Sequence, residues 1–313
     1  MTELVAHSEA MREAVGLAKR VAATDANVLV TGESGSGKDA IAAFIHRESK
    51  RATQPFVRID CATLPGHLLE AELFGYERGA FTGATEAKPG RLEGAHRGTL
   101  VLDEIAYLPT DAQAKLLRVI ETREFQRLGG RRTIRVDARV IALTNVNLAE
   151  AVRRRDFRED LFYRLNVVHI SVPPLRKRGA DLGQLVQTFV RGYAAKHGRA
   201  TLSIAPRALA LLKEYQFPGN VRELANTIER AVIVANGKRI EEAELPESVR
   251  DAVKQQQRRA QPVTLAVIEA EYVREILAAT RGNKAEAARI LGISRKNLYE
   301  RLARSSERMK DKG

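Results

Sequence analysis

The chain has 313 residues, 44% of them hydrophobic, which is enough for about two domains with full cores. Its net charge of +13 favours polyanionic partners such as nucleotides, nucleic acids or acidic protein surfaces. The sequence has neither an apolar run long enough to span a membrane nor a secretory signal, so we expect no contact with a membrane. The single cysteine, Cys61, excludes an intrachain disulfide and fits a buried core position in a reducing compartment.

Four short apolar runs predict the strands of a parallel sheet. Each run ends in polar residues, and segments with helical periodicity, such as 111–125, lie between them. Strands that alternate with helices are typical of a three-layer α/β fold with helices on both faces of the sheet. Ligands of such sheets bind beyond the carboxyl ends of the strands, where these polar ends lie. The four runs are 26–32, 54–61, 98–104 and 139–145.

A change of pattern near residue 172 divides the chain. Only helices are expected between 181 and 249, with a turn at 217–220 that opens one of them. The following segment is rich in Gln and Arg, weakly periodic and interrupted by Pro262, which is typical of a linker. The last 64 residues contain 15 Lys and Arg against 8 Asp and Glu, a charge asymmetry that points to nucleic acid. The expected organisation is an α/β subdomain over 1–172, a helical subdomain over 173–249, a linker over 250–263 and an all-α domain over 264–313.

The segment "GESGSGKD" follows the first predicted strand, opens a predicted helix and matches the P-loop spacing G-x-x-x-x-G-K. Its glycines let backbone N–H groups converge on phosphate oxygens, the helix N-terminus adds positive potential, and Lys38 reaches the outer phosphates. Asp39 stands where a Ser or Thr usually binds magnesium, and its carboxylate either faces the metal or stabilises the first helical turn. The residues predicted to bind nucleotide here are Gly32, Glu33, Ser34, Gly35, Ser36, Gly37, Lys38 and Asp39.

Two adjacent carboxylates end the third predicted strand. We expect Asp103 and Glu104 to point to opposite sides of the pleat, so that Asp103 binds Mg²⁺ and Glu104 polarises a water beside the γ-phosphate of ATP. Without the P-loop, the same pair would be interpreted as the cap of a helix. Asn145 ends the next strand, where its amide either senses the γ-phosphate or forms a turn. The sequence therefore predicts an ATPase that requires ATP and Mg²⁺.

The stretch "GYERGAFTGATE" lies between the P-loop and these carboxylates. Its centre is a run of small residues around one aromatic ring: Gly79, Ala80, Phe81, Thr82, Gly83 and Ala84. The two glycines let the loop fold over or stand up at low steric cost, so the ring either packs against its own subunit or anchors a partner. A second segment, 127–137, has Gly-Gly and several arginines and is expected to form a hairpin. That hairpin supports the first loop, lies near DNA or is merely solvated.

Residues 283–302 have the pattern of a helix-turn-helix. Ala287 and Ala288 belong to the apolar face of the first helix, Gly292 allows a tight turn, and Ser294 caps the second helix. The second helix is polar and basic, which favours DNA over a hairpin that contacts protein alone. The candidate DNA contacts are Arg295, Lys296, Asn297, Tyr299 and Arg301.

These motifs resemble those of the AAA+ ATPases, and more narrowly those of the sigma-54-dependent transcription activators, the bacterial enhancer-binding proteins. The resemblance covers about Val5 to Leu302, and its most specific motif is "GAFTGA". The segments "GESGSGK", "TLVLDEI", "FREDLFYRLNV", "PPLRKR" and "FPGNVREL" fit as well. The resemblance implies a P-loop sheet domain of the AAA+ type, a helical lid subdomain and a terminal helix-turn-helix domain.

The resemblance also implies roles for individual residues. Asn145 lies in the first sensor motif, and Arg222 is the second sensor, which reaches the nucleotide from the lid. Arg158 and Arg164 are candidate arginine fingers for the nucleotide of a neighbouring subunit, either as two fingers or as one catalytic and one structural arginine. Asp60 departs from the family's frequent Asn and would repel the catalytic glutamate unless a proton, metal or arginine intervenes. Phe217 replaces the usual Trp, a change expected to affect packing only.

The function that the resemblance implies is ATP-driven remodelling of sigma-54 RNA polymerase closed complexes into open complexes by a cytoplasmic activator. The loop at Gly79–Ala84 would contact the sigma-54 factor, and a dimerising domain of the factor-for-inversion-stimulation type would bind double-stranded DNA upstream. The chain would assemble into a homo-oligomeric ring, usually a hexamer. The alternative is a DNA-binding regulator or repressor that uses nucleotide only as an assembly switch. Regulation is expected in trans or through a sensor absent from this chain, because the match begins almost at Met1.

Overall fold

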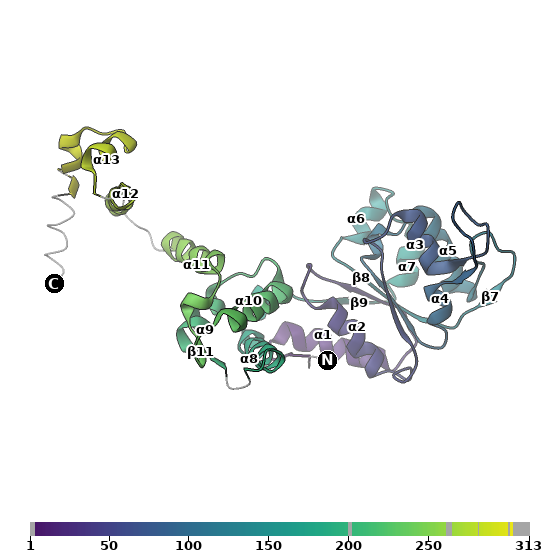
Figure 1. Ribbon diagram of the computed structural model, residues 1–313. Coiled ribbons are helices and arrows are strands. Elements are labelled where there is room, and N and C mark those ends of the chain that lie inside the picture. The colour runs from purple at the N-terminus through teal and green to yellow at the C-terminus, as the bar shows by residue number, and fades with distance from the viewer. Residues whose placement is uncertain (1–3, 200–201, 261–264, 281, 300, 303–313) are drawn as a thin grey trace. The chain divides into compact units, whose positions relative to one another are not determined.

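The computed structural model describes residues 4–199, 202–260, 265–280, 282–299 and 301–302 (Figure 1). The chain divides into two compact units, Met1–Pro246 and Glu247–Gly313, and each is described by itself. Within the described ranges, no helix has the length and apolar character needed to cross a membrane. The larger unit begins with an α/β part and continues into a mainly helical part.

A five-stranded, fully parallel sheet forms the centre of the larger unit, in the order β2-β5-β8-β1-β9. The expected parallel α/β fold is confirmed, and β9 adds a strand beside β1. Because β1, β8 and β5 are neighbours and parallel, their polar carboxyl ends meet at one edge of the sheet. The strands are β1 Val28–Thr31, β2 Phe56–Asp60, β5 Thr99–Asp103, β8 Arg139–Thr144 and β9 Val168–Ser171.

Helices cover both faces of this sheet (Figure 1). The pleat sends successive side chains to opposite faces, so Leu29, Leu100 and Leu102 join one core, while Val28 and Val101 join the other. The first core packs against α3 to α7 and the second against α1 and α2. The helices are α1 Glu9–Ala22, α2 Lys38–Arg47, α3 Gly66–Phe74, α4 Arg91–Gly94, α5 Thr110–Thr122, α6 Leu148–Arg153 and α7 Glu159–Leu165. Cys61 is buried in the first core, as expected.

Two short antiparallel ribbons, β3–β4 and β6–β7, extend from the α/β part. The second contains the expected hairpin, since β6 pairs with β7 across residues 126–133. A bridge between Tyr76 and Leu128 joins the two ribbons, and the amide of Glu77 donates to the carbonyl of Leu128 at 2.9 Å. The hairpin therefore lies against the base of the loop that contains Phe81. The bounds are β3 Gly75–Tyr76, β4 Lys88–Pro89, β6 Glu124–Phe125 and β7 Ile134–Arg135.

The helical lid contains one feature that the sequence interpretation missed. We expected helices only, but β10 and β11 form a short parallel pair, because the amide of Ala205 donates to the carbonyl of Ile240 at 2.9 Å. A two-residue strand has no periodicity to detect. The turn at 217–220 opens α10 as expected, and Phe217 is buried edge-on against Tyr215, with ring centroids 4.9 Å apart. The bounds are α8 Gly179–Lys196, α9 Pro206–Glu214, α10 Asn220–Val234, β10 Ser203–Ile204 and β11 Arg239–Ile240.

The described part of the smaller unit consists of helices joined by turns, with α11 Glu247–Ala260, α12 Leu265–Ala279 and α13 Lys284–Ile290. The linker expected over 250–263 is helical as far as Ala260, because α11 occupies that stretch. The segment 247–260 contains no Gly or Pro, and its Gln, Arg and Ala residues favour helix even without a regular apolar stripe. Beyond α12, Ala287, Ala288 and Leu298 form a small buried core with Val273.

Candidate nucleotide site and its associated loops

The P-loop connects β1 to α2 with the geometry of an anion site. Gly37 adopts a φ of 101° as the N-cap of α2, and Lys38 opens the helix. Within the described chain, several P-loop amides have no hydrogen-bond acceptor, among them those of Gly35, Gly37, Lys38 and Asp39. Free amides at a helix N-terminus are the groups that bind phosphate oxygens. The loop is therefore shaped for the phosphates of a nucleotide.

Lys38 and Glu104 face each other across this loop. Nζ of Lys38 donates to the carbonyls of Gly32 and Glu33 at 3.0 and 3.3 Å and lies 3.8 Å from Oε1 of Glu104. Burial lowers the pKa of Lys38, against the opposing charges of Glu104 and Asp103. The other carboxylate oxygen of Glu104 accepts from the amide of Asn145 at 3.3 Å. The structure thus brings Lys38 and the backbone of Asn145 to the two carboxylate oxygens of Glu104, and contact of the Asn145 side chain with a γ-phosphate stays a prediction.

The expected pleat geometry of the two carboxylates is wrong for Glu104. Asp103 is the last residue of β5, but Glu104 has already left the strand, with a left-handed φ of 50° at the start of the 3-10 turn Ile105–Tyr107. This conformation is costly for a residue with a side chain. Here it turns the glutamate toward Lys38, which an extended strand would not do.

A cavity of about 300 Å³ adjoins the P-loop and opens toward the lid. Apolar side chains from four separate segments form much of its wall, which suits a flat aromatic base. The sequence interpretation did not identify them, because their only signal is to be apolar and far apart along the chain. The residues that line it are Leu4, Val5, Met11, Gly35, Ser36, Gly37, Asp39, Ala40, Arg178, Leu185, Phe189, Val221, Arg222 and Ala225.

Glu33 ties the P-loop to the lid. Its carboxylate accepts from the guanidinium of Arg176 at 2.7 and 2.5 Å and from Nδ2 of Asn220 at 3.1 Å. The hydrogen bonds from Arg176 and then Asn220 lower the pKa of Glu33 to about 2. Asn220 opens α10, from which Nη1 of Arg222 donates to Oγ of Ser34 at 3.0 Å. The second-sensor candidate therefore contacts the P-loop from the lid, together with Arg176 and Asn220, and its contact with nucleotide stays a prediction.

A buried ion pair behind the cavity was also missed. Asp181 is fully buried and accepts from Nε of Arg178, and from the amide and hydroxyl of Ser8, at 2.7–2.8 Å. The same guanidinium donates to the carbonyls of Ser36 and Val5 at 3.2 and 3.1 Å. The pair consequently joins the P-loop, the N-terminal segment and the lid. The only signal in the sequence was its position, since Arg178 ends the "PPLRKR" segment and Asp181 follows three residues later.

The residues present fit a magnesium ion that is held largely by nucleotide. Mg²⁺ uses one or two protein carboxylates together with phosphates and waters. Accordingly, the described residues contain no group of three or more His, Cys, Asp or Glu that could hold a metal by itself. Asp103 supplies one carboxylate at the end of β5, and Asp39 is exposed in the first turn of α2. Oδ2 of Asp103 is bonded to Arg58, a neighbour that the sequence interpretation did not anticipate.

The loop of small residues is closed on itself. The amide of Gly79 donates to the carbonyl of Ala84 at 2.8 Å, and both glycines have a left-handed φ, 80° at Gly79 and 101° at Gly83. The ring of Phe81 packs edge-on against Tyr76 at 5.0 Å, yet 38% of Phe81 remains exposed. The ring therefore packs against its own subunit and still exposes an apolar surface, and its contact with a partner stays a prediction.

The neighbouring hairpin braces the base of that loop. Arg127 donates to Glu93 at 2.8 Å and to Glu77 at 3.2 Å. A Cβ added to Gly129 would lie 2.9 Å from the Cβ of Ala80, so the two segments touch closely. These contacts favour the supporting role among those left open for residues 127–137.

The two finger candidates lie on the surface of α7 and its N-cap. Arg158 pairs with Asp160 at 2.7 Å, and Arg164 pairs with Glu121 at 3.1 Å. Both arginine side chains are exposed. Within this subunit the two arginines are engaged by surface carboxylates, and their contact with a neighbouring subunit's nucleotide stays a prediction.

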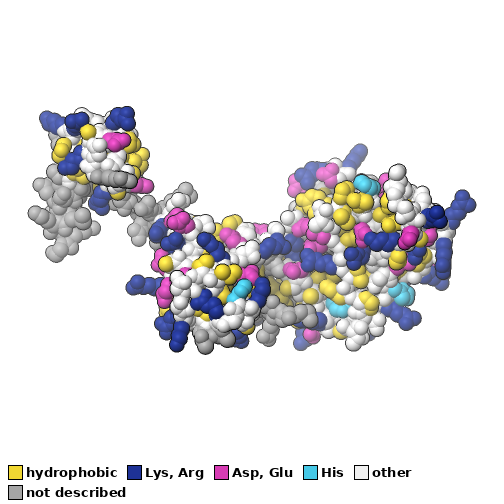
Figure 2. All heavy atoms as spheres, viewed as in Figure 1, with side chains coloured by type: hydrophobic (Ala, Val, Ile, Leu, Met, Phe, Trp, Pro, Cys, Tyr) yellow, Lys and Arg dark blue, Asp and Glu magenta, His cyan; other side chains and the backbone are white. Residues whose placement is uncertain are grey.

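The smaller unit has the helix-turn-helix that was predicted. Gly292 turns with a φ of 64°, and Oγ of Ser294 accepts from the amide of Asn297 at 3.2 Å to cap the second helix. Arg301 pairs with Glu269 at 2.7 Å, and Tyr299 lies 4.8 Å beneath Nζ of Lys284. In Figure 2, Lys and Arg side chains project from this small domain. The described residues offer no ion-pair partner to two further candidates, the exposed Arg295 and Lys296.

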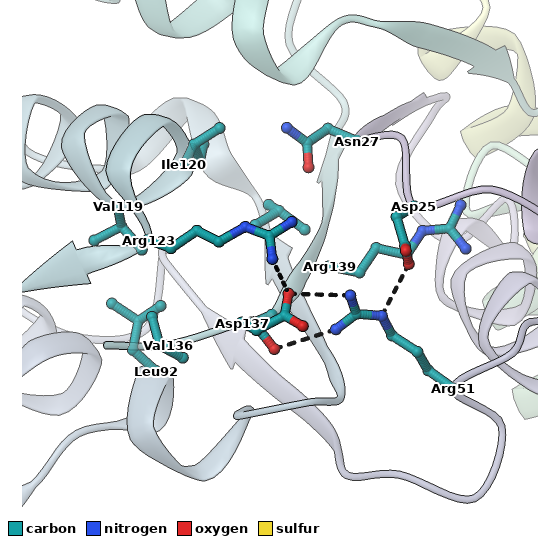
Figure 3. Close-up of a pocket in the computed structure, with 12 residues that line it drawn as sticks. Asp25, Asn27, Arg51, Leu92, Val119, Ile120, Arg123, Val136, Asp137 and Arg139 are labelled. Carbon is teal, nitrogen blue, oxygen red and sulfur yellow. Dashed lines mark hydrogen bonds and ion pairs between the residues drawn. The ribbon is translucent and has the colours of Figure 1, made fainter. Parts of the chain in front are cut away.

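A second cavity, of about 140 Å³, lies at the amino end of β8 and is structural (Figure 3). Arg51 binds Asp25 and Asp137 at 2.9 and 3.1 Å, and Arg123 joins Asp137 at 2.9 Å. Arg139, only 2% exposed, donates to the carbonyls of residues 21, 22 and 26 at 2.9–3.4 Å and so closes the end of α1. The charged side chains around this cavity are therefore bonded to one another and to the backbone, which indicates a structural role.

Three family models match the chain in succession. Residues 4–171 match the sigma-54 interaction domain, 176–262 the AAA+ ATPase lid domain and 264–304 the Fis family of bacterial regulatory proteins. The first match alone covers more than half of the chain.

Known proteins resemble the chain over nearly its whole length. Regulatory protein AtoC of Escherichia coli K12 is 43% identical over 307 residues, which cover 96% of this chain and 67% of AtoC. Transcriptional regulatory protein ZraR of Klebsiella oxytoca is 46% identical over 306 residues, covering 96% of this chain and 68% of ZraR. The crystal structure of NtrX from Brucella abortus in complex with ATP matches with a TM-score of 0.73 and 36% identity, over 97% of this chain and 69% of NtrX.

Proposed function

Because the chain belongs to the sigma-54 interaction domain family, we propose that it hydrolyses ATP to convert closed complexes of sigma-54 RNA polymerase into open complexes. It is an AAA+ P-loop ATPase and a transcriptional activator. This supports the activator over the alternative of a regulator that uses nucleotide only as an assembly switch. The observation that carries the remodelling step is the exposed ring of Phe81 on a loop of the same domain that holds Lys38 and Glu104.

In this proposal the phosphates bind the free P-loop amides and Lys38, and the base enters the apolar cavity beside the lid. A γ-phosphate at Lys38 competes with Glu104 for the ammonium group, which frees the glutamate to polarise the attacking water. Asn145 orients that glutamate through its backbone N–H, and Arg222 senses the phosphates from the lid. Mg²⁺, held by Asp103 and the phosphates, would neutralise negative charge on the phosphoryl group during transfer.

Movement at the nucleotide can reach the loop through α3. The ends of β2 and β5 are paired at Asp60 and Asp103, and α3 leads from β2 directly into β3 and the loop. A shift at this sheet edge would therefore raise or lower the six-residue loop, with Gly79 and Gly83 as hinges. When raised, the ring of Phe81 and the hydroxyl of Thr82 would contact the sigma-54 factor.

The remaining partners follow from the smaller unit and from the arginines on α7. We propose that residues 264–313 bind double-stranded DNA upstream of the promoter as a dimer, chiefly through Arg295 and Lys296. Arg158 and Arg164 would act on a neighbouring subunit within a homo-oligomeric ring, possible only if that subunit displaces Asp160 and Glu121. An activator that works on polymerase and DNA would act in the cytoplasm.

The test is ATP-dependent open-complex formation on a sigma-54 promoter with purified polymerase. Thr82→Ala should keep ATPase activity within about twofold but lower open-complex formation more than about tenfold, because it changes the contact and not the catalytic site. Glu104→Gln should lower the ATPase rate roughly 100-fold or more. Thr85→Ala, an exposed threonine just outside the run, is the matched control and should behave as wild type. A wild-type protein that hydrolyses ATP without opening the promoter would refute the remodelling step.

A further inference from the structure

Arg58 lies beside the metal-binding carboxylate, although no nucleotide motif calls for an arginine there. It belongs to β2, the neighbour of β5, and its Nη2 donates to Oδ2 of Asp103. The other oxygen, Oδ1, accepts from the amide of Glu104 at 3.0 Å. Both carboxylate oxygens are therefore engaged, and a cation holds one of them.

The charges around Arg58 explain why a cation lies at this position. Asp60 is paired in register with Asp103, and Asp39 opens the helix that follows the P-loop. Arg58 and Asp60 lie two residues apart on β2, so their side chains share one face of the sheet. Carboxylates gathered in this way repel one another unless a positive group intervenes. Arg58 supplies such a positive group at Asp103, on the strand that also carries Asp60.

A divalent ion and this guanidinium compete for the same oxygen. Mg²⁺ requires close oxygen ligands at ideal octahedral positions, which a guanidinium bonded to Oδ2 would obstruct. The side chain of Asp103 is only 12% exposed and is held at the end of its strand, whereas that of Arg58 is 46% exposed. The arginine is thus the partner that can move. Asp60, paired in register with Asp103, and Asp39, in the first turn of α2, offer it alternative counter-charges.

We propose that Arg58 occupies the cation position at Asp103 in the nucleotide-free protein and yields it to Mg²⁺ when nucleotide binds, remaining in the site opposite Asp60 and Asp39. This inference rests on the proposed Mg²⁺-dependent ATPase. Arg58 acts through Asp103 and is a positioning residue: it keeps the acidic cluster open to phosphates before the metal arrives, and it lowers the affinity for the metal.

The test measures binding of a fluorescent ADP to the full chain in EDTA and over a titration of Mg²⁺. Arg58→Met removes the charge and keeps the chain length. It should weaken metal-free ADP binding roughly three- to tenfold, because unopposed carboxylates repel the phosphates. It should also lower the Mg²⁺ concentration for half-maximal binding by a similar factor, because no cation has to be displaced. These opposite shifts distinguish the proposal from a merely structural role, which would weaken binding in both conditions.

Three further variants complete the experiment. Arg135→Met removes an exposed arginine that pairs with Glu124 far from the P-loop motifs, and both measurements should stay at wild-type values. Arg58→Lys keeps the charge and should retain metal-free ADP binding. Adding Asp60→Asn to Arg58→Met should restore metal-free binding, because it removes the charge that Arg58 opposes. Equal changes with and without Mg²⁺, or none, overturn the proposal, whereas wild type that binds no ADP refutes the ATPase instead.

Discussion

The buried carboxylate of Asp181 is expected to contribute strongly to the stability of this protein. Its two oxygens accept from four donors, the amides of His7 and Ser8, the hydroxyl of Ser8 and Nε of Arg178. Asp181→Asn would leave the buried guanidinium of Arg178 without its counter-charge, at a cost of about 3–5 kcal/mol. We expect this loss in urea denaturation at pH 7. Glu229→Gln, which breaks an exposed lid pair with Lys196, is the matched control and should cost less than about 1 kcal/mol.

The acid dependence of the same residue has a definite sign. Burial acts to raise the pKa of Asp181, but the hydrogen bonds from Arg178, Ser8 and His7 lower it overall. A lowered folded-state pKa adds stability above the ordinary Asp value of about 3.9, and this stability is lost as the pH falls through the folded-state value. The stability difference between wild type and Asp181→Asn should therefore shrink on acidification. A difference that stays constant from pH 7 to acid would contradict the ion-pair account.

At the scale of elements, α8 offers a paired test with two glycines. Gly192 lies in the helix interior, and a Cβ added there would meet no atom within 4 Å. Gly192→Ala should therefore stabilise the lid by about 0.5–1 kcal/mol through helix propensity. Gly198 follows the helix with a left-handed φ of 69°, so Gly198→Ala should destabilise by about 1 kcal/mol. Thermal unfolding of the two variants, made in the same background, should shift in opposite directions.

The sequence was sufficient to predict most elements but few of the contacts between them. The strands ending at Thr31 and Asp103 were predictable, because an apolar run with a polar end has few other interpretations. The left-handed backbone conformation of Glu104 was not predictable, because it depends on where strand β5 ends, at Asp103. The bonds of Arg58 to Asp103 and of Asn220 to Glu33 join residues 45 and 187 positions apart, and only the folded sheet and lid bring them together. Local patterns carry no information about such pairs.

At the scale of the whole molecule, each part of the nucleotide machinery depends on segments distant in sequence. The P-loop is held by Arg176 and Asn220 from the lid, and the base cavity needs residues near the N-terminus as well. The guanidinium groups of Arg158 and Arg164, in contrast, pair with Asp160 and Glu121 on the surface of their own subunit. The site of one subunit thus contains its phosphate-binding and water-activating groups but no contact with these two arginines. If the two arginines are the proposed fingers, a complete catalytic site requires two subunits.

That requirement can be tested by mixing two inactive variants. Lys38→Ala removes phosphate binding but keeps both surface arginines, whereas Arg164→Ala keeps the P-loop and loses one candidate finger. If Arg164 acts across the interface, a mixed ring contains sites with an intact P-loop from one variant and an intact arginine from the other. Random assembly of an equal mixture should then restore roughly a quarter of the wild-type ATPase rate, because about that share of interfaces combines the two. Mixing Lys38→Ala with Glu104→Gln should restore no ATPase activity, because Lys38 and Glu104 belong to the same subunit's site, and each site of the mixed ring lacks one of them. If the first mixture also stays inactive while both variants still assemble, Arg164 is a structural arginine that pairs with Glu121.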